Sequence, residues 1–526
     1  MVNVEKTSTV IEHHRKALAR SYDYVIVGAG SAGCVVARRL VDGTDATVLL
    51  LEAGGSGEGV ASLSNPLQWV ENLGSRYDWA YHYEPSSHVA GRSIPLPLGK
   101  VLGGSGSING MVWVRGHRAD YDDWAAAGNA GWDFESVLPL FKKSEDWEDG
   151  ASELRGAGGP IHVERARNLH PVAAGFIDAG RSYGMPYLDD LNIPEPEGVG
   201  PMNLNIKEGR RCGPADAYLR PVMAHRNLTV LTEAPTVKLT LAGTRCTGVE
   251  LLLDGELYPV GASREVILCA GTIHTPRLLL LSGVGPHADL ERLGIDTVID
   301  LPGVGRNLQD HLWIMGLCFE SKHPLPGPTH NLAGSAGFWR SRPALDRPDL
   351  MLMPLQAPVV SDELAAEYPI PPDAFAICPC LVRPRSRGYL RLRTAAPDGP
   401  LEIQPNFLTE QADVEALTSC VELGLDLTAQ PAYRELVKRW VVPPTRMNRE
   451  ATVAFVRRSC WGYIHPVGTC AMGSAREAVV DTELRVRGIE GLRITDASVM
   501  PTIPSANTNV ASIMIGEFAS RLLVAG

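Results

Sequence analysis

The stretch that most constrains this chain is residues 22–52, YDYVIVGAGSAGCVVARRLVDGTDATVLLLE. Residues 24–27 form a short, apolar, β-branched run, which is typical of one buried parallel strand. From residue 31 to residue 40 the spacing of apolar residues becomes helical, and residues 46–51 predict a second strand. The stretch therefore predicts a strand–helix–strand unit.

Three glycines stand where the first strand ends, at Gly28, Gly30 and Gly33 in the pattern GxGxxG. They allow a tight turn, close approach of backbone to a pyrophosphate, and close packing of the helix on the strand. The free N–H groups of the helix would face that phosphate. Glu52 lies about 20 residues further on, where an acid accepts a ribose hydroxyl. An acid here argues against a 2′-phosphate, so the motif predicts NAD or FAD and does not choose between them.

The composition excludes several classes of protein. The chain has 526 residues, which favours two domains over one small core. Its net charge of −11 argues against nucleic acid and anionic membrane surfaces as partners. No run of about 18 apolar residues occurs, so no transmembrane segment is predicted. Residues 1–20 are polar, lack the apolar core of a signal peptide, and are expected to precede the folded part.

The 10 cysteines are scattered without paired spacing. Cys34 and Cys269 fall in apolar runs, where a free thiol is a small core residue. We therefore expect a reducing compartment, the cytoplasm. The sequence has no cluster of His, Asp and Glu with metal-ligand spacing, so no metal site is predicted.

A second glycine-rich segment, PLPLGKVLGGSGSINGMVWVRG, spans residues 95–116. Its glycines exclude a stable helix interior, because each costs about 1 kcal/mol there relative to alanine. Two interpretations are open: a backbone that runs close along a flat ligand, or a flexible surface loop. The apolar run at residues 111–114 would anchor the end of the segment and favours the ligand.

The later part of the chain changes character twice. Residues 227–241, 246–253 and 256–260 predict antiparallel strands, and residues 265–269 predict a separate buried strand. Gly271 follows, and Pro276 predicts a helix that starts near Thr275. The proline-rich residues 318–461 predict a second domain with strands and a helix at 411–430. A strand at residues 492–495 then leads to Asp496, and residues 508–523 predict a long apolar helix.

Four motifs occur in an order that resembles the glucose–methanol–choline oxidoreductases, a flavoprotein family. They are GxGxxG with Glu52; GKVLGGSGSINGMVWVRG; AGTIHTPRLLLLSGVGP; and YIHPVGTCAMG followed by GLRITDASVMPTIPSANTNVASIMIGE. Shorter matches are DWAYHYEP, GRRCGPADAYLRP and PGVGRNLQDH. The resemblance runs from residue 22 to the C-terminus.

The resemblance implies an α/β fold. A Rossmann-like FAD-binding domain would be assembled from residues 21–160, 211–317 and 462–526. A substrate-binding domain with an antiparallel sheet and helices, residues 161–210 and 318–461, would be inserted into it.

The resemblance also implies FAD rather than NAD. The residues implied to contact it are Gly28, Gly30, Ser31, Ala32, Gly33, Glu52, Ala53, Leu102, Gly103, Gly104, Ser105, Ser107, Ile108, Asn109, Gly110, Val112, Val237, Ala270, Gly271, Asp496, Ala497, Asn507, Thr508 and Asn509. Among them, the first glycines would meet the pyrophosphate and Glu52 the adenosine ribose, and the backbone of Val237 would hold the adenine. Some relatives attach the flavin through a histidine in the glycine-rich loop, where this chain has Ile108, so the FAD is expected to be non-covalent.

The family's catalytic pair falls on His465 and Asn507. Hydride transfer from an alcohol to flavin N5 requires a base for the hydroxyl proton, and an imidazole with a pKa of about 6.5 is neutral at pH 7. Asn507 can hold the substrate oxygen, orient the imidazole, or cap the helix that follows it. His13, His14 and His311 are given no role.

The resemblance implies oxidation of a CH–OH group to the carbonyl. Neutral aromatic or aliphatic primary alcohols are the first expectation for the substrate, with polyols and a choline-like cation left open. Electrons would pass to O2 or to another acceptor such as a quinone. A second hypothesis is a hydroxynitrile-lyase-type enzyme that binds FAD on the same scaffold without redox turnover.

Overall fold

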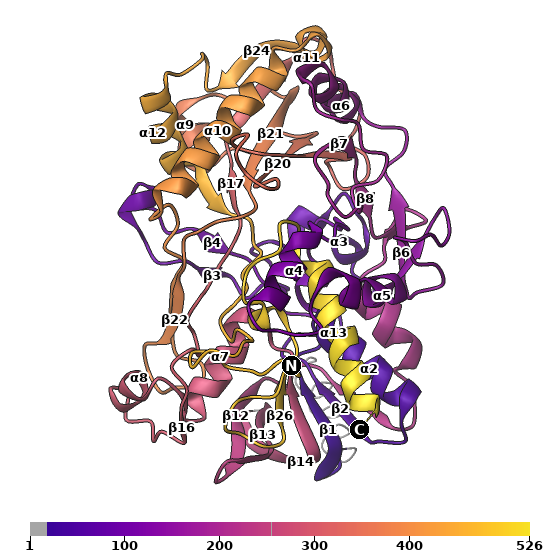
Figure 1. Ribbon diagram of the computed structural model, residues 1–526, viewed down its shortest axis with the longest axis vertical. Helices are drawn as coiled ribbons and strands as arrows, with labels where there is room; N and C mark the ends of the chain where they lie inside the picture. The colour runs from indigo at the N-terminus through magenta and orange to yellow at the C-terminus, as the bar shows by residue number, and fades with distance from the viewer. Residues whose placement is uncertain (1–17, 254, 526) are drawn as a thin grey trace, which may run out of the picture.

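The protein folds around two β-sheets, seen at the bottom and the top of Figure 1. This computed structural model describes residues 18–253 and 255–525, so the expected extension at residues 1–20 lies almost wholly outside the described residues. The two sheets are joined by several crossings of the chain, as the mixed colours of Figure 1 show.

The first sheet has the strand order β11–β2–β1–β14–β13–β12, with β26 paired to β14. Its strands are β1 (Ser21–Val27), β2 (Val48–Leu51), β11 (Leu228–Leu231), β12 (Thr236–Ala242), β13 (Arg245–Leu253), β14 (Glu256–Leu268) and β26 (Leu492–Ile494). β11, β2, β1, β14 and β26 are joined by parallel pairings. β12 and β13 extend the sheet in antiparallel fashion.

The parallel strands place the expected cofactor residues at one edge of this sheet. Gly28 follows β1, Glu52 follows β2, Ala270 lies just beyond β14, and Asp496 lies just beyond β26. Ligands of open α/β sheets bind outside the carboxyl ends of the strands. Four segments that are distant in sequence therefore meet where a dinucleotide is expected.

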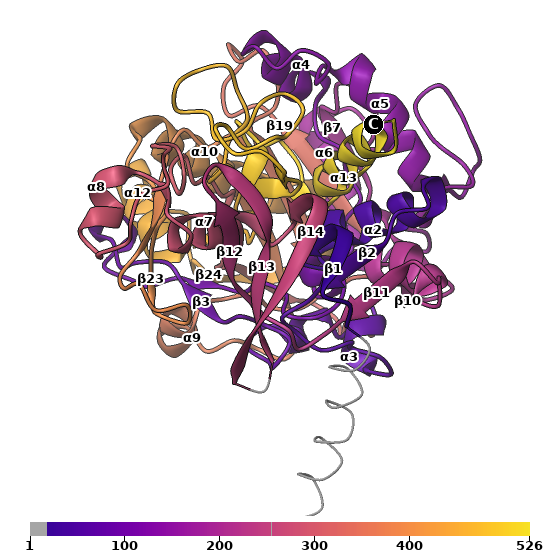
Figure 2. The same cartoon turned by 90° about the horizontal axis from the view of Figure 1, so that it is seen from below.

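Helices α2 (Ser31–Gly43) and α13 (Thr508–Ala525) lie side by side against this sheet (Figures 1 and 2). Their backbones approach closely at Gly516, where an added Cβ would lie 2.9 Å from Cβ of Val35. Arg39 of α2 binds the buried carboxylate of Glu517 at 2.6 Å. The C-terminal helix is thus fixed to the helix that follows the glycine turn.

The second sheet has the order β24–β18–β21–β20–β19–β7, with β17 paired to β21 and β25, and its pairings are antiparallel. Its strands are β7 (Gly198–Pro201), β17 (Leu312–Ile314), β18 (Leu317–Ser321), β19 (Ser335–Trp339), β20 (Leu350–Leu355), β21 (Ala374–Leu381), β24 (Val437–Val442) and β25 (Cys460–Gly462). α6 (Pro171–Tyr183) and α10 (Gln411–Thr428) pack on it. The expected boundary after residue 317 falls inside this sheet, because β17 pairs with β21.

The remaining elements connect and cover the two sheets. The helices are α3 (Ala61–Ser64), α4 (Arg118–Ala126), α5 (Phe134–Ser144), α7 (Gly271–Leu281), α8 (His287–Glu291), α9 (Asp362–Glu367), α11 (Pro431–Leu436) and α12 (Arg449–Ser459). The short strands are β3 (Tyr81–His82), β4 (Pro95–Leu96), β5 (Glu145–Trp147), β6 (Ile161–Arg165), β8 (Asn203–Leu204), β9 (Ile206–Lys207), β10 (Arg210–Arg211), β15 (Val284–Gly285), β16 (Ile299–Asp300), β22 (Tyr389–Leu392) and β23 (Leu401–Gln404).

Two strand expectations are wrong in detail. β14 is one continuous strand, although residues 256–260 and 265–269 predict two. Its first half pairs antiparallel with β13 and its second half parallel with β1, and the change occurs at Gly261, which pairs with both. β11 is expected to be antiparallel but pairs parallel with β2.

The helix expected near Thr275 begins four residues earlier, at Gly271. Pro276 therefore lies inside α7, where it has no N–H to donate to the carbonyl of Thr272. The hydroxyl of Thr469 donates to that carbonyl at 2.6 Å instead. A distant segment thus supplies the hydrogen bond that the proline cannot make.

Candidate active site

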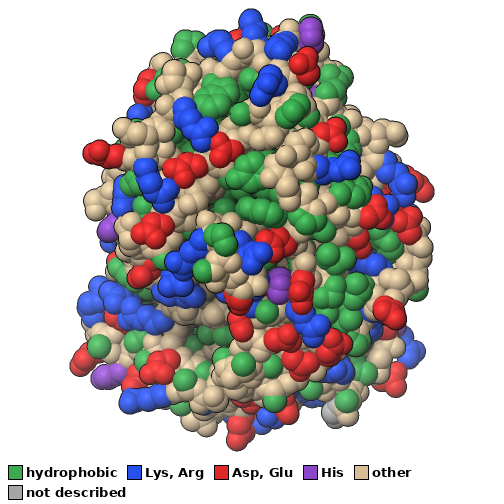
Figure 3. Space-filling model, turned by 45° about the horizontal axis from the view of Figure 1, so that its top comes forward, with side chains coloured by type: hydrophobic (Ala, Val, Ile, Leu, Met, Phe, Trp, Pro, Cys, Tyr) green, Lys and Arg blue, Asp and Glu red, His purple; other side chains and the backbone are tan. Residues whose placement is uncertain are grey.

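A cavity of about 1710 Å³ lies between the carboxyl edge of the first sheet and the second sheet. Single small-molecule sites have volumes of about 300–1,000 Å³, so this cavity has room for a large cofactor and a substrate together. On the face shown in Figure 3, acidic and basic side chains are interspersed and apolar side chains gather near the middle.

Most residues expected to contact the cofactor line this cavity. They are Gly28, Gly30, Ser31, Ala32, Glu52, Ala53, Gly104, Ser105, Ile108, Asn109, Gly110, Val112, Val237, Ala270, Gly271, Asp496, Ala497, Asn507, Thr508 and Asn509, together with the expected base His465. Gly33, Leu102, Gly103 and Ser107 are not among the lining residues.

Those four residues lie behind the cavity wall and fix the backbone that forms it. A Cβ on Gly33 would lie 2.0 Å from the carbonyl oxygen of Gly28, so this position fixes the approach of α2 to β1. Gly103 has a positive φ of 89°, and a Cβ there would lie 2.1 Å from the hydroxyl of Ser107. That hydroxyl donates to the carbonyl of Leu102 at 2.7 Å. The glycine-rich loop is therefore an ordered turn, and not a flexible surface loop.

Glu52 is buried at the end of β2 and accepts two backbone hydrogen bonds. Oε2 accepts from the N–H of Ala29 at 3.0 Å, and Oε1 accepts from the N–H of Gly54 at 2.8 Å. Burial raises the pKa of Glu52 to about 7, against the lowering effect of these N–H groups. The carboxyl group keeps free lone pairs on the cavity side, where a ribose hydroxyl can donate.

Asp496 joins β26 to the beginning of α7. Its Oδ2 accepts from the N–H of Gly271 at 2.8 Å and from the hydroxyl of Thr275 at 2.6 Å. Burial raises the pKa of this carboxyl group. These hydrogen bonds fix the segment that carries Asn507 to the start of α7, where the motif AGTIHTPRLLLLSGVGP begins.

His465 and Asn507 lie together in the cavity wall, 42 residues apart in sequence. Nε2 of His465 lies 3.2 Å from Nδ2 of Asn507. The backbone N–H of His465 donates to Oδ1 of Asp310 at 2.7 Å, and the hydroxyl of Tyr83 donates to Oδ2 of Asp310 at 2.8 Å. The buried aspartate thus fixes the backbone that carries the imidazole.

His311, to which the sequence motifs assign no role, determines which nitrogen of His465 carries the proton. Nε2 of His311 lies 3.0 Å from the carbonyl oxygen of Pro504, which can only accept, so Nε2 carries the proton of this imidazole. Burial lowers the pKa of His311 to about 3, so the ring is neutral and its Nδ1 accepts. That Nδ1 lies 3.0 Å from Nδ1 of His465, which must therefore donate.

The consequence is an unprotonated Nε2 on His465, facing the amide N–H of Asn507. Burial, and secondly His311, hold the pKa of His465 well below its usual value of 6.5. This imidazole is a neutral base at pH 7, and its Nε2 lone pair accepts from the amide of Asn507 at the cavity wall.

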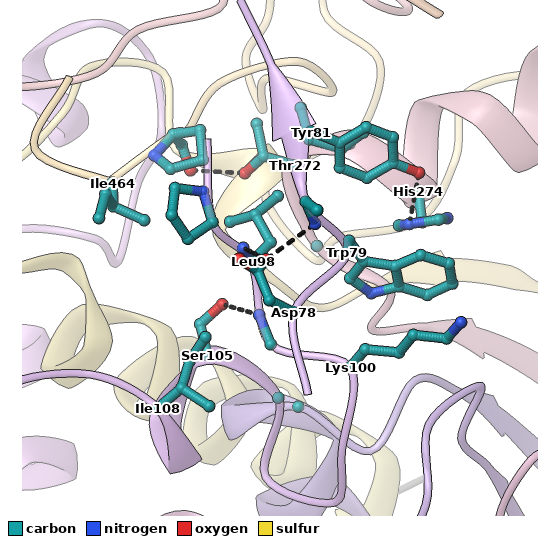
Figure 4. A pocket seen from close by; sticks show the side chains of 18 of the residues that line it. Asp78, Trp79, Tyr81, Leu98, Lys100, Ser105, Ile108, Thr272, His274 and Ile464 are labelled. Atoms are coloured by element: carbon teal, nitrogen blue, oxygen red, sulfur yellow. Dashed lines mark hydrogen bonds between the residues drawn. The ribbon is translucent and has the colours of Figure 1, made fainter. Parts of the chain in front are cut away.

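A wall of rings lies on the other side of the cavity (Figure 4). The rings of Trp79 and His274 lie 4.0 Å apart, and the hydroxyl of Tyr81 lies 3.0 Å from Nε2 of His274. The ammonium of Lys100 lies 4.6 Å from the centre of the Trp79 ring. Figure 4 shows these four side chains opposite Ile464, the neighbour of His465. DWAYHYEP supplies two of them, but its spacing alone assigns no ligand.

The cavity fits a flavin dinucleotide at the residues named for it. Gly30 lies at the N-terminus of α2, and a Cβ there would have no contact closer than 3.7 Å, which leaves the approach to the helix open. Asn509, hydrogen-bonded to Ser31 through its Oδ1, has a buried Nδ2 without a partner. Oδ1 of Asn507 likewise has none. Both amides remain available for polar groups of a ligand.

Two family models, both described as GMC oxidoreductase, match residues 22–313 and 384–516 of the chain. The chain belongs to the GMC oxidoreductase family. Its fold class, its FAD and its action on the CH–OH group of an alcohol follow from that membership, as the sequence motifs predicted.

Several members resemble the chain along nearly its whole length. Human mitochondrial choline dehydrogenase is 39% identical over 95% of this chain and 89% of its own. The oxygen-dependent choline dehydrogenase of Photobacterium profundum is 37% identical over 96% and 93%. Pyridoxine 4-oxidase from Mesorbium loti has a similar structure, with a TM-score of 0.92, 33% identity and coverage of 96% and 99%.

Two absences concern the residues that the structure describes. These residues contain no group of three or more His, Cys, Asp or Glu side chains that could hold a metal ion. In the described part of the chain, no helix is long and apolar enough to cross a membrane.

Proposed function

We propose that this GMC oxidoreductase oxidises a neutral aromatic or aliphatic primary alcohol to the aldehyde, with Nε2 of His465 as the base. The observation that carries the proposal is the hydrogen-bonded series from Pro504 through His311 to His465, which leaves Nε2 unprotonated beside the cavity. A neutral imidazole in this position accepts the hydroxyl proton of an alcohol.

Asn507 has a second part in the proposed reaction. Nδ2 of Asn507 lies 3.2 Å from Nε2 of His465 and carries two hydrogens. A substrate hydroxyl that takes the place of the amide at Nε2 can accept a hydrogen bond from Asn507 while it donates to His465. Such a donor stabilises the negative charge that develops on the oxygen as the proton leaves. His465 then holds the proton at Nε2, while Nδ1 keeps its hydrogen bond to His311.

FAD, when bound, supplies the acceptor for the hydride that leaves the alcohol carbon. We assign Gly28, Gly30 and Ser31 to its pyrophosphate, Glu52 to the adenosine ribose and Val237 to the adenine. The segments of residues 104–110 and 496–509 are assigned to the flavin end. We propose non-covalent attachment, since Ile108 offers no nucleophile in the loop that lines the flavin end.

The remaining proposals concern the setting of the reaction. The first sheet with its helices would form the cofactor domain and the second sheet the substrate domain. The chain would enter the second sheet first at β7 and again at Leu312, the first residue of β17. The acceptor would be O2 or a quinone-type compound. We keep the cytoplasm as the proposed compartment, supported by 10 free thiols, nine of them buried.

The experiment that tests the proposal is anaerobic mixing of the FAD-loaded enzyme with a panel of primary alcohols. The visible absorption of oxidised flavin should bleach with at least one neutral alcohol and return in air or with a quinone. A lyase on this scaffold would instead consume a hydroxynitrile and leave the flavin oxidised throughout, which would refute the proposal.

A further inference from the structure

The part of the cavity wall that the second sheet contributes is apolar. Trp313 of β17, Met353 and Leu355 of β20, and Trp461 of β25 all line it. Trp313, Met353 and Leu355 belong to one cluster of packed apolar side chains, and Trp461 and Tyr463 pack against its edge. The other lining residues of this region are also uncharged; they are Met315, Asn331, Leu332, Ala333, Ala357, Pro358, Val359 and Val360.

This wall lies directly beside the proposed base. The ring of Tyr463 lies 4.5 Å from that of His465, and the ring of Trp313 stacks on Tyr463 at 5.1 Å. The hydroxyl of Tyr463 donates to the sulfur of Met353 at 3.2 Å. A substrate whose hydroxyl group reaches His465 therefore places the rest of its body against these side chains.

The carboxylates that line the cavity, among the described residues, lie elsewhere. They are Glu52, Asp78, Glu84, Asp398 and Asp496. Glu52 and Asp496 serve the turns after β2 and β26. Asp78 accepts from the N–H groups of residues 74, 80 and 98.

The other two carboxylates, Glu84 and Asp398, belong to the side of the cavity that carries Arg277 and Arg393. Glu84 pairs with Arg393 at 2.8 Å. Asp398 lies between two residues whose carbonyl oxygens accept from Arg277. Asp310, behind the backbone of His465, does not line the cavity, and both its oxygens accept hydrogen bonds from the protein.

A fixed cation on the substrate would therefore meet no carboxylate at this wall. Burying an unpaired charge is strongly unfavourable, and unlike an amine a quaternary ammonium cannot release a proton to avoid the cost. Aromatic faces can bind such cations. Here, however, Trp313 and Tyr463 stack on one another with an interplanar angle of 21°, so one face of each ring is covered by the other ring and is closed to a cation.

We propose that the substrate site selects an uncharged alcohol with an apolar body and discriminates against quaternary ammonium alcohols such as choline. This specificity separates the chain from the choline dehydrogenases that it resembles. It rests on the proposed function, because it places the reacting hydroxyl group at His465.

The test compares choline with 3,3-dimethylbutan-1-ol, its neutral isostere, in which carbon replaces the quaternary nitrogen. Shape and hydroxyl position are matched, so the rate of anaerobic flavin reduction per unit substrate concentration reports the effect of the charge. The isostere should be favoured by at least about tenfold, which corresponds to ~1.4 kcal/mol. An equal rate or a preference for choline would overturn the inference and leave the proposed alcohol oxidation intact.

Failure of the proposed function gives a different result. In that case neither compound, nor benzyl alcohol or 1-hexanol, would bleach the flavin, and the specificity inference would fail with it. Bleaching by benzyl alcohol or 1-hexanol with none by choline supports both the proposed alcohol oxidation and the specificity inference.

A charge introduced into the wall provides an independent test. Met353→Glu places a carboxylate beside Tyr463, and Met353→Gln has nearly the same size without the charge. The glutamate should raise the ratio of choline to isostere rates by about tenfold or more, while the glutamine should leave that ratio near the wild-type value. FAD content verifies folding of each variant, and an unchanged ratio in a folded Met353→Glu enzyme that still oxidises the isostere would contradict the inference.

Discussion

At the level of single residues, the direction of hydrogen bonding around His465 is set by a backbone carbonyl. The carbonyl of Pro504 fixes the tautomer of His311, and His311 fixes that of His465. His311 touches neither the cavity nor, in the proposed reaction, the substrate. It is a positioning residue, and its effect on the reaction is separable from that of the base.

Replacing His311 tests this role. His311→Ala removes the acceptor for Nδ1–H of His465, so either nitrogen of that imidazole can carry the proton and the ring can turn. Removing the hydrogen bond that orients a metal-ligating histidine typically costs about 10- to 100-fold, and the same geometric role is assigned to His311. We expect a loss of this size in the rate of anaerobic flavin reduction, with unchanged FAD content.

The conservative variant and the pH profile distinguish positioning from a structural defect. In His311→Asn, Oδ1 can take the place of Nδ1, so most of the rate should return. The base is lost when His465 is protonated, so the wild-type rate should fall only well below pH 6.5, because the pKa of His465 is lowered. Without His311 one cause of the lowering is gone, and the fall should begin at higher pH. An alanine variant with a wild-type pH profile, or an asparagine variant as slow as alanine, would speak against this role.

His465 could be assigned from its motif, whereas His311 could not. The sequence PGVGRNLQDH places His311 after a loop, and nothing in its spacing indicates a contact 154 residues away. Antiparallel pairing of β17 with β25 brings the two histidines together, since Leu312 pairs with Gly462. Pairing between distant strands is a property of the fold, and a local pattern does not report it.

At the level of elements, two glycines of the first turn have different functions. A Cβ at position 33 would collide with the backbone of Gly28, whereas a Cβ at position 30 would meet only an ordinary contact. Gly33 therefore serves the packing of α2 on β1, and Gly30 leaves space for the ligand.

This difference predicts opposite outcomes for two alanine variants. Gly33→Ala should lower the melting temperature of the apoprotein, because α2 must move away from β1. Gly30→Ala should leave that temperature nearly unchanged and weaken FAD binding by about tenfold or more, or ~1.4 kcal/mol. Titration of the apoproteins with FAD and thermal melts measure both effects. Full FAD affinity in Gly30→Ala would show that the pyrophosphate does not approach this glycine.

The glycine-rich loop leads to a prediction about flavin attachment. Ile108 lines the cavity at the end of this loop and has no nucleophilic atom. Acid precipitation should therefore release the yellow cofactor into the supernatant. Flavin retained in the washed pellet would show a covalent bond to another residue.

At the level of the whole molecule, the cavity joins two sheets whose separate character is visible in the sequence. The strand–helix–strand unit at residues 22–52 predicts β1, α2 and β2, because apolar periodicity and glycine chemistry are local. The long β14 was not predictable in the same way. Its two halves have different partners, and Pro259 within it is a residue that usually interrupts strands.

The start of helix α7 was likewise not predictable from the local sequence. Pro276 favours a helix start nearby, whereas α7 begins at Gly271, and the hydroxyl of Thr469, 197 residues away, donates to the carbonyl that the proline leaves without its usual donor. The apolar wall of the second sheet also depends on pairing between distant strands. Sequence motifs thus named most of the residues that line the cavity near the first sheet, and they left the wall formed by the second sheet open.

Asn507 and His465 should contribute unequally to the reaction that this cavity supports. Asn507→Ala removes a neutral hydrogen bond, which is worth about 1 kcal/mol, or about fivefold in rate, in addition to any misorientation of substrate. His465→Ala removes the base itself. A larger loss of flavin reduction in Asn507→Ala, with FAD still bound, would reverse the two roles.

The most direct test is the rate of anaerobic flavin reduction by one neutral alcohol in the wild-type enzyme and in His465→Ala. General bases contribute about 10² to 10⁴ in rate, so the variant should reduce its flavin more slowly by that factor. Its FAD content should match the wild type, because the assigned pyrophosphate and ribose residues lie at other strand ends. A His465→Ala enzyme that reduces its flavin as fast as the wild type would contradict the assignment of His465 as the base.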